Sequence, residues 1–233
     1  MQIYPLPGFY EPFSSISHLA GACVFAILGA ILIQEARGHT GRMVCMGVYV
    51  FSTVFLLSMS GVYHMLDEGS TARAVLGRLD FAAIFVLIAG THTPVQWLFF
   101  RGAARWITLT VMWSAAIVGV TFFSIYYEEL PPALGTAIFL VLGWFAGVCG
   151  LIVWKRLGTA QIRLLIMGGV MYSIGAVLMG LQWPTLVPGV IGSHEIWHVA
   201  VLTAMAMHWR FFYLFASQDR DEPCPPAHHP IGP

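Results

Sequence analysis

Seven long apolar runs, separated by short joints of polar, glycine or proline residues, dominate the sequence. A helix needs about 20 predominantly apolar residues to cross the roughly 30 Å of hydrocarbon in a bilayer. The runs occupy approximately 15–34, 43–65, 79–99, 106–125, 134–154, 164–182 and 193–215. Pro94 is expected to bend or end the third run, because proline cannot donate the backbone hydrogen bond of a helix interior. The pattern predicts an all-α integral membrane protein, a seven-transmembrane-helix bundle.

The joints are short, which favours one compact unit over separate domains. We expect a single transmembrane domain over residues 1–216, followed by a polar, proline-rich tail over residues 217–233 that is disordered. Only 9% of the 233 residues are charged, against roughly 25% in a soluble domain. The 11 basic and 11 acidic residues balance, so there is no electrostatic case for nucleic-acid binding. The N-terminus has no basic segment followed by a short apolar core, which argues against a cleaved signal peptide.

The distribution of lysine and arginine predicts the orientation in the membrane. Nine of these residues fall on the side that holds the C-terminus, and two, Arg73 and Arg78, fall on the side that holds the N-terminus. Cytoplasmic loops carry the excess of positive charge. We therefore expect a multi-pass protein of a bacterial inner or plasma membrane, with the N-terminus outside and the C-terminus in the cytoplasm.

Five ionisable residues fall at span ends that face the same side of the membrane. They are His18, His64, Asp80, His194 and His198. Ionisable groups in membrane spans are costly, and the default interpretation of each is functional. The last two histidines are one helical turn apart, so both imidazoles can reach one metal ion. Scattered core histidines would have no reason to share a level.

Three neutral imidazoles, from His64, His194 and His198, with water at a fourth position match an open, catalytic zinc site. A carboxylate at Asp80 could orient that water and take its proton, and the metal would bring the pKa of the water near 7. Ser60 lies one turn deeper than His64 on the same helical face, where its hydroxyl could stabilise a developing oxyanion. Isolated histidines such as His92 and His208 are more simply hydrogen-bonding helix contacts.

Residues 194–198 also fit H-E-x-x-H, the zinc protease helix in which the glutamate is the general base. Glu195 could then reach the metal-bound water, or it could instead hold a hydrogen bond to a metal ligand. The next acidic residues downstream lie in the polar tail, and no NPDG-like loop follows the motif. An intramembrane zinc peptidase is therefore a minority interpretation.

Three motifs in order resemble the hemolysin III family, which belongs with the progestin and adipoQ receptors and is similar to the alkaline ceramidases. The motifs are Ser60-Gly61-Val62-Tyr63-His64, the run Arg78 to Pro94 with its Leu-Asp-Phe and Ala-Gly-Thr-His-Thr segments, and His194 to His198. Ser17-His18 also resembles an early Ser/Thr-His of the family. The resemblance covers nearly the whole chain.

The resemblance implies a seven-helix bundle with zinc held by His64, His194 and His198. It also implies Asp80 beside the zinc-bound water and Ser60 nearby. Two residues depart from the usual pattern: His92 stands where the family has Tyr, and Phe81 where His is common. The eukaryotic receptors are understood to have a cytoplasmic N-terminus, opposite to the orientation that the basic residues predict here.

Several functions remain open from the sequence. Similarity to ceramidases points to zinc-dependent hydrolysis of an amide or ester in a membrane lipid or other fatty-acyl substrate. A receptor or regulator of membrane lipid state would use the same ligands around a structural zinc. The family name implies a haemolysin-like pore, but seven apolar spans cannot supply the secreted soluble form that a pore-former normally needs.

Overall fold

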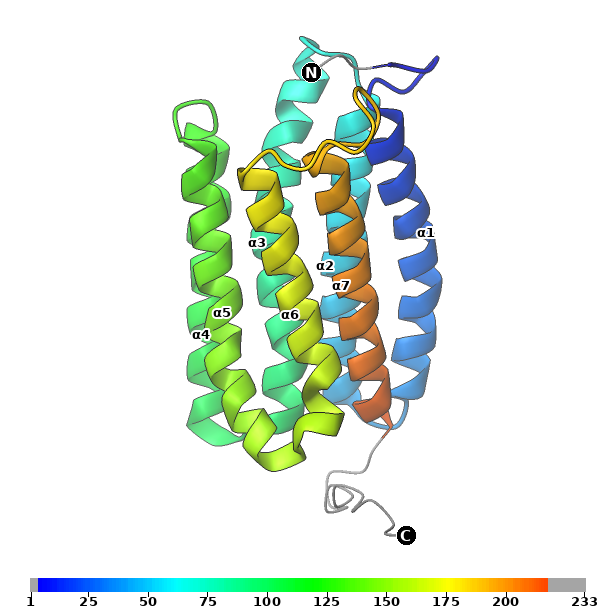
Figure 1. Cartoon of the computed structure of the whole chain (residues 1–233). Helices are drawn as coiled ribbons and strands as arrows, with labels where there is room; N and C mark the ends of the chain where they lie inside the picture. Colours follow the sequence, from blue (N-terminus) through cyan, green and yellow to red (C-terminus); the bar gives the residue numbers. More distant parts are fainter. Residues whose placement is uncertain (1–3, 218–233) are drawn as a thin grey trace, which may run out of the picture.

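Residues 4–217, which the computed structural model describes, form seven long helices that lie side by side (Figure 1). The helices are α1 (Pro12–Glu35), α2 (Thr40–Met65), α3 (Thr71–Phe99), α4 (Gly102–Tyr126), α5 (Pro132–Leu157), α6 (Thr159–Gly180) and α7 (Ser193–Ala216). All seven are long and apolar enough to cross a membrane. The predicted seven-helix membrane bundle is confirmed, and the tail over residues 218–233 lies outside the described part of the chain.

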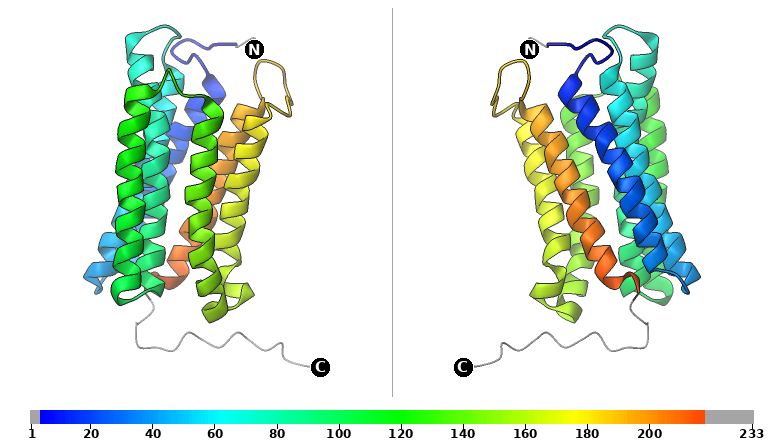
Figure 2. Two further views of the ribbon diagram at one scale, coloured as in Figure 1. Left: turned by 90° about the vertical axis from the view of Figure 1, so that its left-hand side faces the viewer. Right: turned by 90° about the vertical axis from the view of Figure 1, so that its right-hand side faces the viewer.

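Six helices close into a ring, and the remaining helix, α4, lies outside it. Around the ring, neighbours pack in the order α1, α2, α3, α5, α6 and α7, and α7 returns to α1. Helix α4 packs against α3 on the outer side, and Figure 2 shows this arrangement from two sides. Helix α7 lies between α6 and α1 and also contacts α2, so its first turn lies near the end of α2. The ring therefore brings together helix ends that are far apart in sequence.

Helix α3 begins earlier than its apolar run, at Thr71 rather than near residue 79. Ser70 provides the N-cap, because its side-chain oxygen accepts a hydrogen bond from the backbone N–H of Arg73 at 3.2 Å. Hydropathy marks only the part of a helix that sits in hydrocarbon, so it misses this polar first segment. The helix also continues through Pro94 to Phe99. The expectation that Pro94 could end the span was wrong, since neighbouring helices make such a proline tolerable in a membrane bundle.

The segment before α1 is attached to the last turn of α2. The backbone N–H of Glu11 donates to the carbonyl of His64 at 2.9 Å, and that of Tyr10 donates to the carbonyl of Met65 at 3.2 Å. These bonds satisfy two of the carbonyls that a helix end leaves without an internal partner. They also hold the start of α1 next to the functional end of α2.

Close approach of α1 and α2 continues one turn deeper. A Cβ placed on Gly61 would lie 2.7 Å from Cγ of Leu19, so only glycine fits without a shift. The hydroxyl of Ser15 donates to the carbonyl of Gly61 at 2.7 Å. Below this contact, a buried apolar cluster that includes Leu57 and Met205 fills the middle of the bundle. The polar groups described next therefore lie above an apolar layer.

Candidate metal centre

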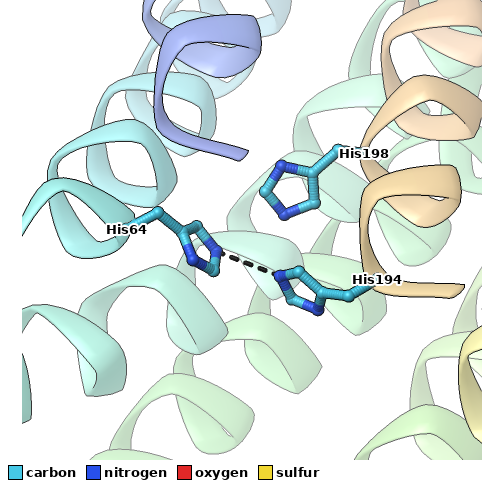
Figure 3. A group of neighbouring side chains, drawn as sticks. All are labelled: His64, His194 and His198. Carbon is cyan, nitrogen blue, oxygen red and sulfur yellow. Dashed lines mark hydrogen bonds between the residues drawn. The ribbon is translucent and has the colours of Figure 1, made fainter. Parts of the chain in front are cut away.

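Three histidines from two helices meet at the end of the bundle that holds the start of α1. His64 lies in the last turn of α2, and His194 and His198 lie in the first turns of α7. One ring nitrogen of each lies within 4.8 Å of the others, and the three rings face one another (Figure 3). The side chains of His64 and His198 are buried, with 2% and 1% exposed. Among the described residues, this group has the composition and geometry that could hold a metal ion.

The nitrogen atoms of these histidines converge on one point. Nε2 of His64 and Nε2 of His194 lie 3.2 Å apart. The three pairs of ring centroids are separated by 4.7 to 4.8 Å. Nδ1 of His198 is buried and has no hydrogen-bond partner, so its ring is not held by protein contacts through that atom. Converging imidazole nitrogens with few competing partners are what a metal site requires.

Asp80 and Ser60 lie next to this group. Ser60 is on α2, one turn deeper than His64, and its side chain is buried. Asp80, on α3, is near enough to both Ser60 and His64 to interact with them. The structure therefore places both residues that the sequence selected beside the three histidines. The arrangement offers an acceptor for a proton and a hydroxyl donor at one location.

His18, the fifth residue predicted at this level, lies behind the cluster. Its ring stacks on that of His198, with the centroids 3.7 Å apart and the planes inclined by 11°. It does not belong to the group of three converging nitrogens. His18 thus contributes packing against one face of His198.

Glu11 is the residue of the site that the sequence interpretation missed. One of its carboxylate oxygens, Oε2, contacts Nδ1 of His64, and the other, Oε1, accepts a hydrogen bond from Nη2 of Arg73 at 3.0 Å. Burial alone would raise the pKa of the Glu11 carboxyl, but the contact with His64 and the charge of Arg73 outweigh it, and the pKa is lowered. The only signal in the sequence is its place directly before the first span.

The carboxylate oxygens of Glu195 are hydrogen-bonded to groups other than the histidines. Its Oε2 accepts a hydrogen bond from the backbone N–H of Gly192 at 2.8 Å, and its Oε1 accepts one from the hydroxyl of Ser14 at 3.0 Å. The first of these bonds is half of a capping box at the start of α7. Both oxygens are thus engaged in holding the helix start and its contact with α1. This geometry disfavours Glu195 as the general base of a zinc peptidase.

A pocket opens beside the cluster on the same end of the bundle. It has a volume of about 410 Å³, and its lining includes Tyr63, Arg73 and Tyr127. Tyr63 packs edge-on against His64, with the centroids 4.7 Å apart, so the pocket and the histidines share a wall. Burial raises the pKa of Tyr127 to about 12, which keeps its hydroxyl protonated and able to donate a hydrogen bond. The pocket is separated from the histidine cluster by the Tyr63 ring.

Two further buried histidines lie away from the cluster, as helix contacts. Nε2 of His208 lies 3.1 Å from the carbonyl oxygen of Leu165, which joins α7 to α6. The ring of His92 faces that of Phe145 on α5, with the centroids 6.4 Å apart. The contact of His208 agrees with the simpler interpretation of isolated membrane histidines as hydrogen-bonding helix contacts. His92 does not fit that interpretation, because neither of its ring nitrogens has a hydrogen-bond partner among the described residues.

Comparison with known proteins agrees with the motif resemblance. The family model described as Haemolysin-III related matches residues 9–209. Hemolysin-3 of Bacillus cereus is 31% identical over 196 residues, which cover 83% of this chain and 86% of that protein. The monocyte to macrophage differentiation factor of Homo sapiens is 25% identical, with 89% and 87% covered. The adiponectin receptor protein of Drosophila melanogaster is 26% identical, with 88% of this chain and 53% of that protein covered.

Proposed function

Because the chain belongs to the Haemolysin-III related family, we propose that it is a zinc-dependent hydrolase that cleaves an amide or ester bond in a membrane lipid. One observation carries the proposal: three histidine nitrogens converge near a carboxylate and a serine hydroxyl that neighbour each other. All of these groups lie in a multi-pass membrane bundle. A substrate that already resides in the bilayer fits this location.

The donor set supports zinc as the ion. Zinc–nitrogen bonds are about 2.0–2.1 Å, so two imidazole nitrogens on a tetrahedral ion lie roughly 3.3 Å apart. The two Nε2 atoms of His64 and His194 are 3.2 Å apart. Three histidines with one position left over are the ligand pattern of catalytic zinc sites, whereas structural sites are closed by four protein ligands. When bound, zinc would supply a Lewis acid that polarises a carbonyl and lowers the pKa of a coordinated water.

Asp80 and Ser60 would be the residues of the chain that take part in hydrolysis beside the metal ligands. The Asp80 carboxylate would orient an attacking water and accept its proton, as a general base does. The Ser60 hydroxyl would donate a hydrogen bond to the oxygen that becomes negative when the carbonyl is attacked. The two groups are already neighbours in the structure. The acid form of Asp80 could then return the proton to the leaving group.

The position of the site in the bundle suits a lipid with a polar head. The histidines lie in the end turns of α2 and α7, where acyl chains meet headgroups. The lining of the neighbouring pocket includes the polar residues Ser70, Thr71 and Glu68. A headgroup in this pocket would leave the bond next to it within reach of the site. This arrangement supports a lipid amide or ester over a soluble substrate.

A second candidate is a receptor or regulator of membrane lipid state with structural zinc. The proximity of the Asp80 carboxylate to His64 favours it, because a carboxylate so placed could serve as the fourth protein ligand and close the site. One of the similar proteins is named an adiponectin receptor protein. The two candidate functions therefore differ in whether Asp80 acts as a general base or as a fourth zinc ligand.

The test measures zinc content and fatty-acid release from purified protein with a panel of lipid amides and esters. Asp80→Asn should keep its zinc and lose hydrolysis, because an amide cannot accept the proton. Asp67→Asn, a change in the exposed α2–α3 loop, is the matched control and should leave both unchanged. Loss of zinc from Asp80→Asn, or no zinc-dependent release by wild type, would favour the structural role.

A further inference from the structure

His64 is the one histidine of the cluster whose two ring nitrogens both have a described side-chain neighbour. Nε2 faces Nε2 of His194, and Nδ1 contacts Oε2 of Glu11. A neutral imidazole carries one N–H and one lone pair, and the partner of one nitrogen decides which is which. An ionised carboxylate can only accept a hydrogen bond, so contact with Glu11 places the proton on Nδ1. The lone pair of Nε2 is then directed into the cluster, where a metal ligand needs it.

The Glu11 carboxylate is itself held in place on its other side. Oε1 accepts a hydrogen bond from Nη2 of Arg73 at 3.0 Å. Nη1 of Arg73 donates to the carbonyl of Leu66 at 2.6 Å, and its guanidinium lies 4.9 Å from the ring centroid of Tyr10 and 4.6 Å from that of Tyr63. The carboxylate side chain is 22% exposed, which limits competition from water. Glu11 therefore cannot rotate away without breaking several contacts.

The backbone adds a second constraint on the same pair. The N–H of Glu11 donates to the carbonyl of His64 at 2.9 Å, so the two residues are joined through main chain and side chain together. Glu195, the acidic residue nearest to the other two histidines in sequence, has both oxygens occupied by Gly192 and Ser14. Among the described residues, Glu11 thus supplies the carboxylate that directly contacts a ring nitrogen of the cluster.

We propose that Glu11 is a positioning residue, held by Arg73, that fixes the tautomer and orientation of His64 for metal binding. This inference rests on the metal site proposed above. Carboxylates that accept a hydrogen bond from a metal-bound histidine typically affect affinity 10- to 100-fold. A loss of affinity in that range is expected when the carboxylate is removed.

Glu11→Gln is an informative change because Arg73 restricts how the amide can sit. The guanidinium only donates, so it takes the amide oxygen and turns the amide NH2 group toward His64. Nδ1 would then have to accept, and the proton would move to Nε2, which faces the cluster. The substitution is nearly isosteric, yet it reverses the tautomer.

The experiment measures zinc affinity of the full-length protein in detergent by competition with a chelator. Glu11→Gln should weaken binding about 10- to 100-fold, and Glu129→Gln should leave it unchanged. Glu129 is the matched control, since its side chain is exposed in the turn after α4, at the same end of the bundle. Glu11→Asp keeps the charge but shortens the reach of the carboxylate toward His64, so it should also weaken binding.

A double-mutant cycle separates positioning from a general structural effect. In a His64→Ala background, Glu11→Gln should produce no further loss of zinc affinity, because the group that it orients is gone. Equal losses in both backgrounds, or wild-type affinity in both Glu11 variants, would overturn the inference while leaving the metal site intact. A wild-type protein that binds no zinc would overturn both this inference and the proposed function.

Discussion

The ring of His18 lies flat against the ring of His198, with the centroids 3.7 Å apart and the planes only 11° from parallel. Both side chains are buried, at 2% and 1% exposure. Two charged imidazolium rings would repel each other at this separation, so the stack requires at most one charge. The contact links α1 to α7 and supports one face of a candidate metal ligand.

This stack predicts different outcomes for two substitutions of His18. His18→Phe preserves a flat ring and should keep zinc binding near the wild-type level. His18→Ala removes the ring, leaves a cavity next to His198 and should lower stability by about 2–4 kcal/mol, with weaker zinc binding. Thermal unfolding in detergent together with zinc titration checks both. If His18→Phe lost zinc completely, His18 would have a polar role that stacking does not explain.

Glu195 should matter for stability rather than for chemistry. Its two oxygens bind the Gly192 N–H and the Ser14 hydroxyl, so Glu195→Ala should lower the stability of the fold by about 1 kcal/mol. Hydrolysis per zinc-loaded protein should stay within a few-fold of wild type. A peptidase of the H-E-x-x-H type would instead lose nearly all activity with zinc retained. The ratio of turnover to bound zinc in Glu195→Gln decides whether Glu195 only stabilises the fold or acts as a general base.

Gly61→Ala should separate α1 from α2 beside the site. The added Cβ would meet Cγ of Leu19 at 2.7 Å and its backbone nitrogen at 3.0 Å, and backbone cannot move as easily as a side chain. We expect a loss of about 1–3 kcal/mol in stability. Gly47→Ala is the control on the same helix, because nothing lies within 4 Å of its added Cβ. Equal thermal midpoints for the two variants would show that the close approach at Gly61 is unimportant.

The orientation in the membrane is a separate prediction, which rests on the nine-to-two distribution of basic residues. It places the C-terminus in the cytoplasm, and the histidine cluster with the N-terminus outside. A green fluorescent protein fused to the C-terminus should fluoresce, and alkaline phosphatase fused there should be inactive. The opposite pair of results would place the metal centre on the cytoplasmic side.

Much of the fold follows from patterns that the sequence displays openly. Long apolar runs mark the spans, and their odd number places the end of α2 at the same level as the start of α7. That parity predicts that His64 lies at the same level as His194 and His198, because each helix rises a fixed distance per residue. The packing of α7 beside α1 and α2 then brings the three together. The starts of the helices are less visible: α3 gains a polar first segment from Thr71 that hydropathy does not register.

The role of Glu11 could not be predicted from the sequence, for a different reason. A single acidic residue before a span has no spacing or periodicity that distinguishes it from a solvated loop residue. Its role depends on the return of the chain onto the end of α2, where Glu11 N–H binds the carbonyl of His64, and on the guanidinium of Arg73. Glu195 is the opposite case: it fits the H-E-x-x-H motif of zinc proteases, but in the structure its side chain caps the start of α7. Tertiary contacts decide such roles, and short motifs do not contain them.

The central claim is that His64, His194 and His198 hold a zinc ion, and elemental analysis of the detergent-purified protein tests it most directly. Wild type should contain about one zinc per chain. His64→Ala and His198→Ala should lose most of it, whereas His208→Ala, a change at a buried histidine outside the cluster, should retain it. Full zinc content in both His64→Ala and His198→Ala, or no zinc in wild type, would contradict the account.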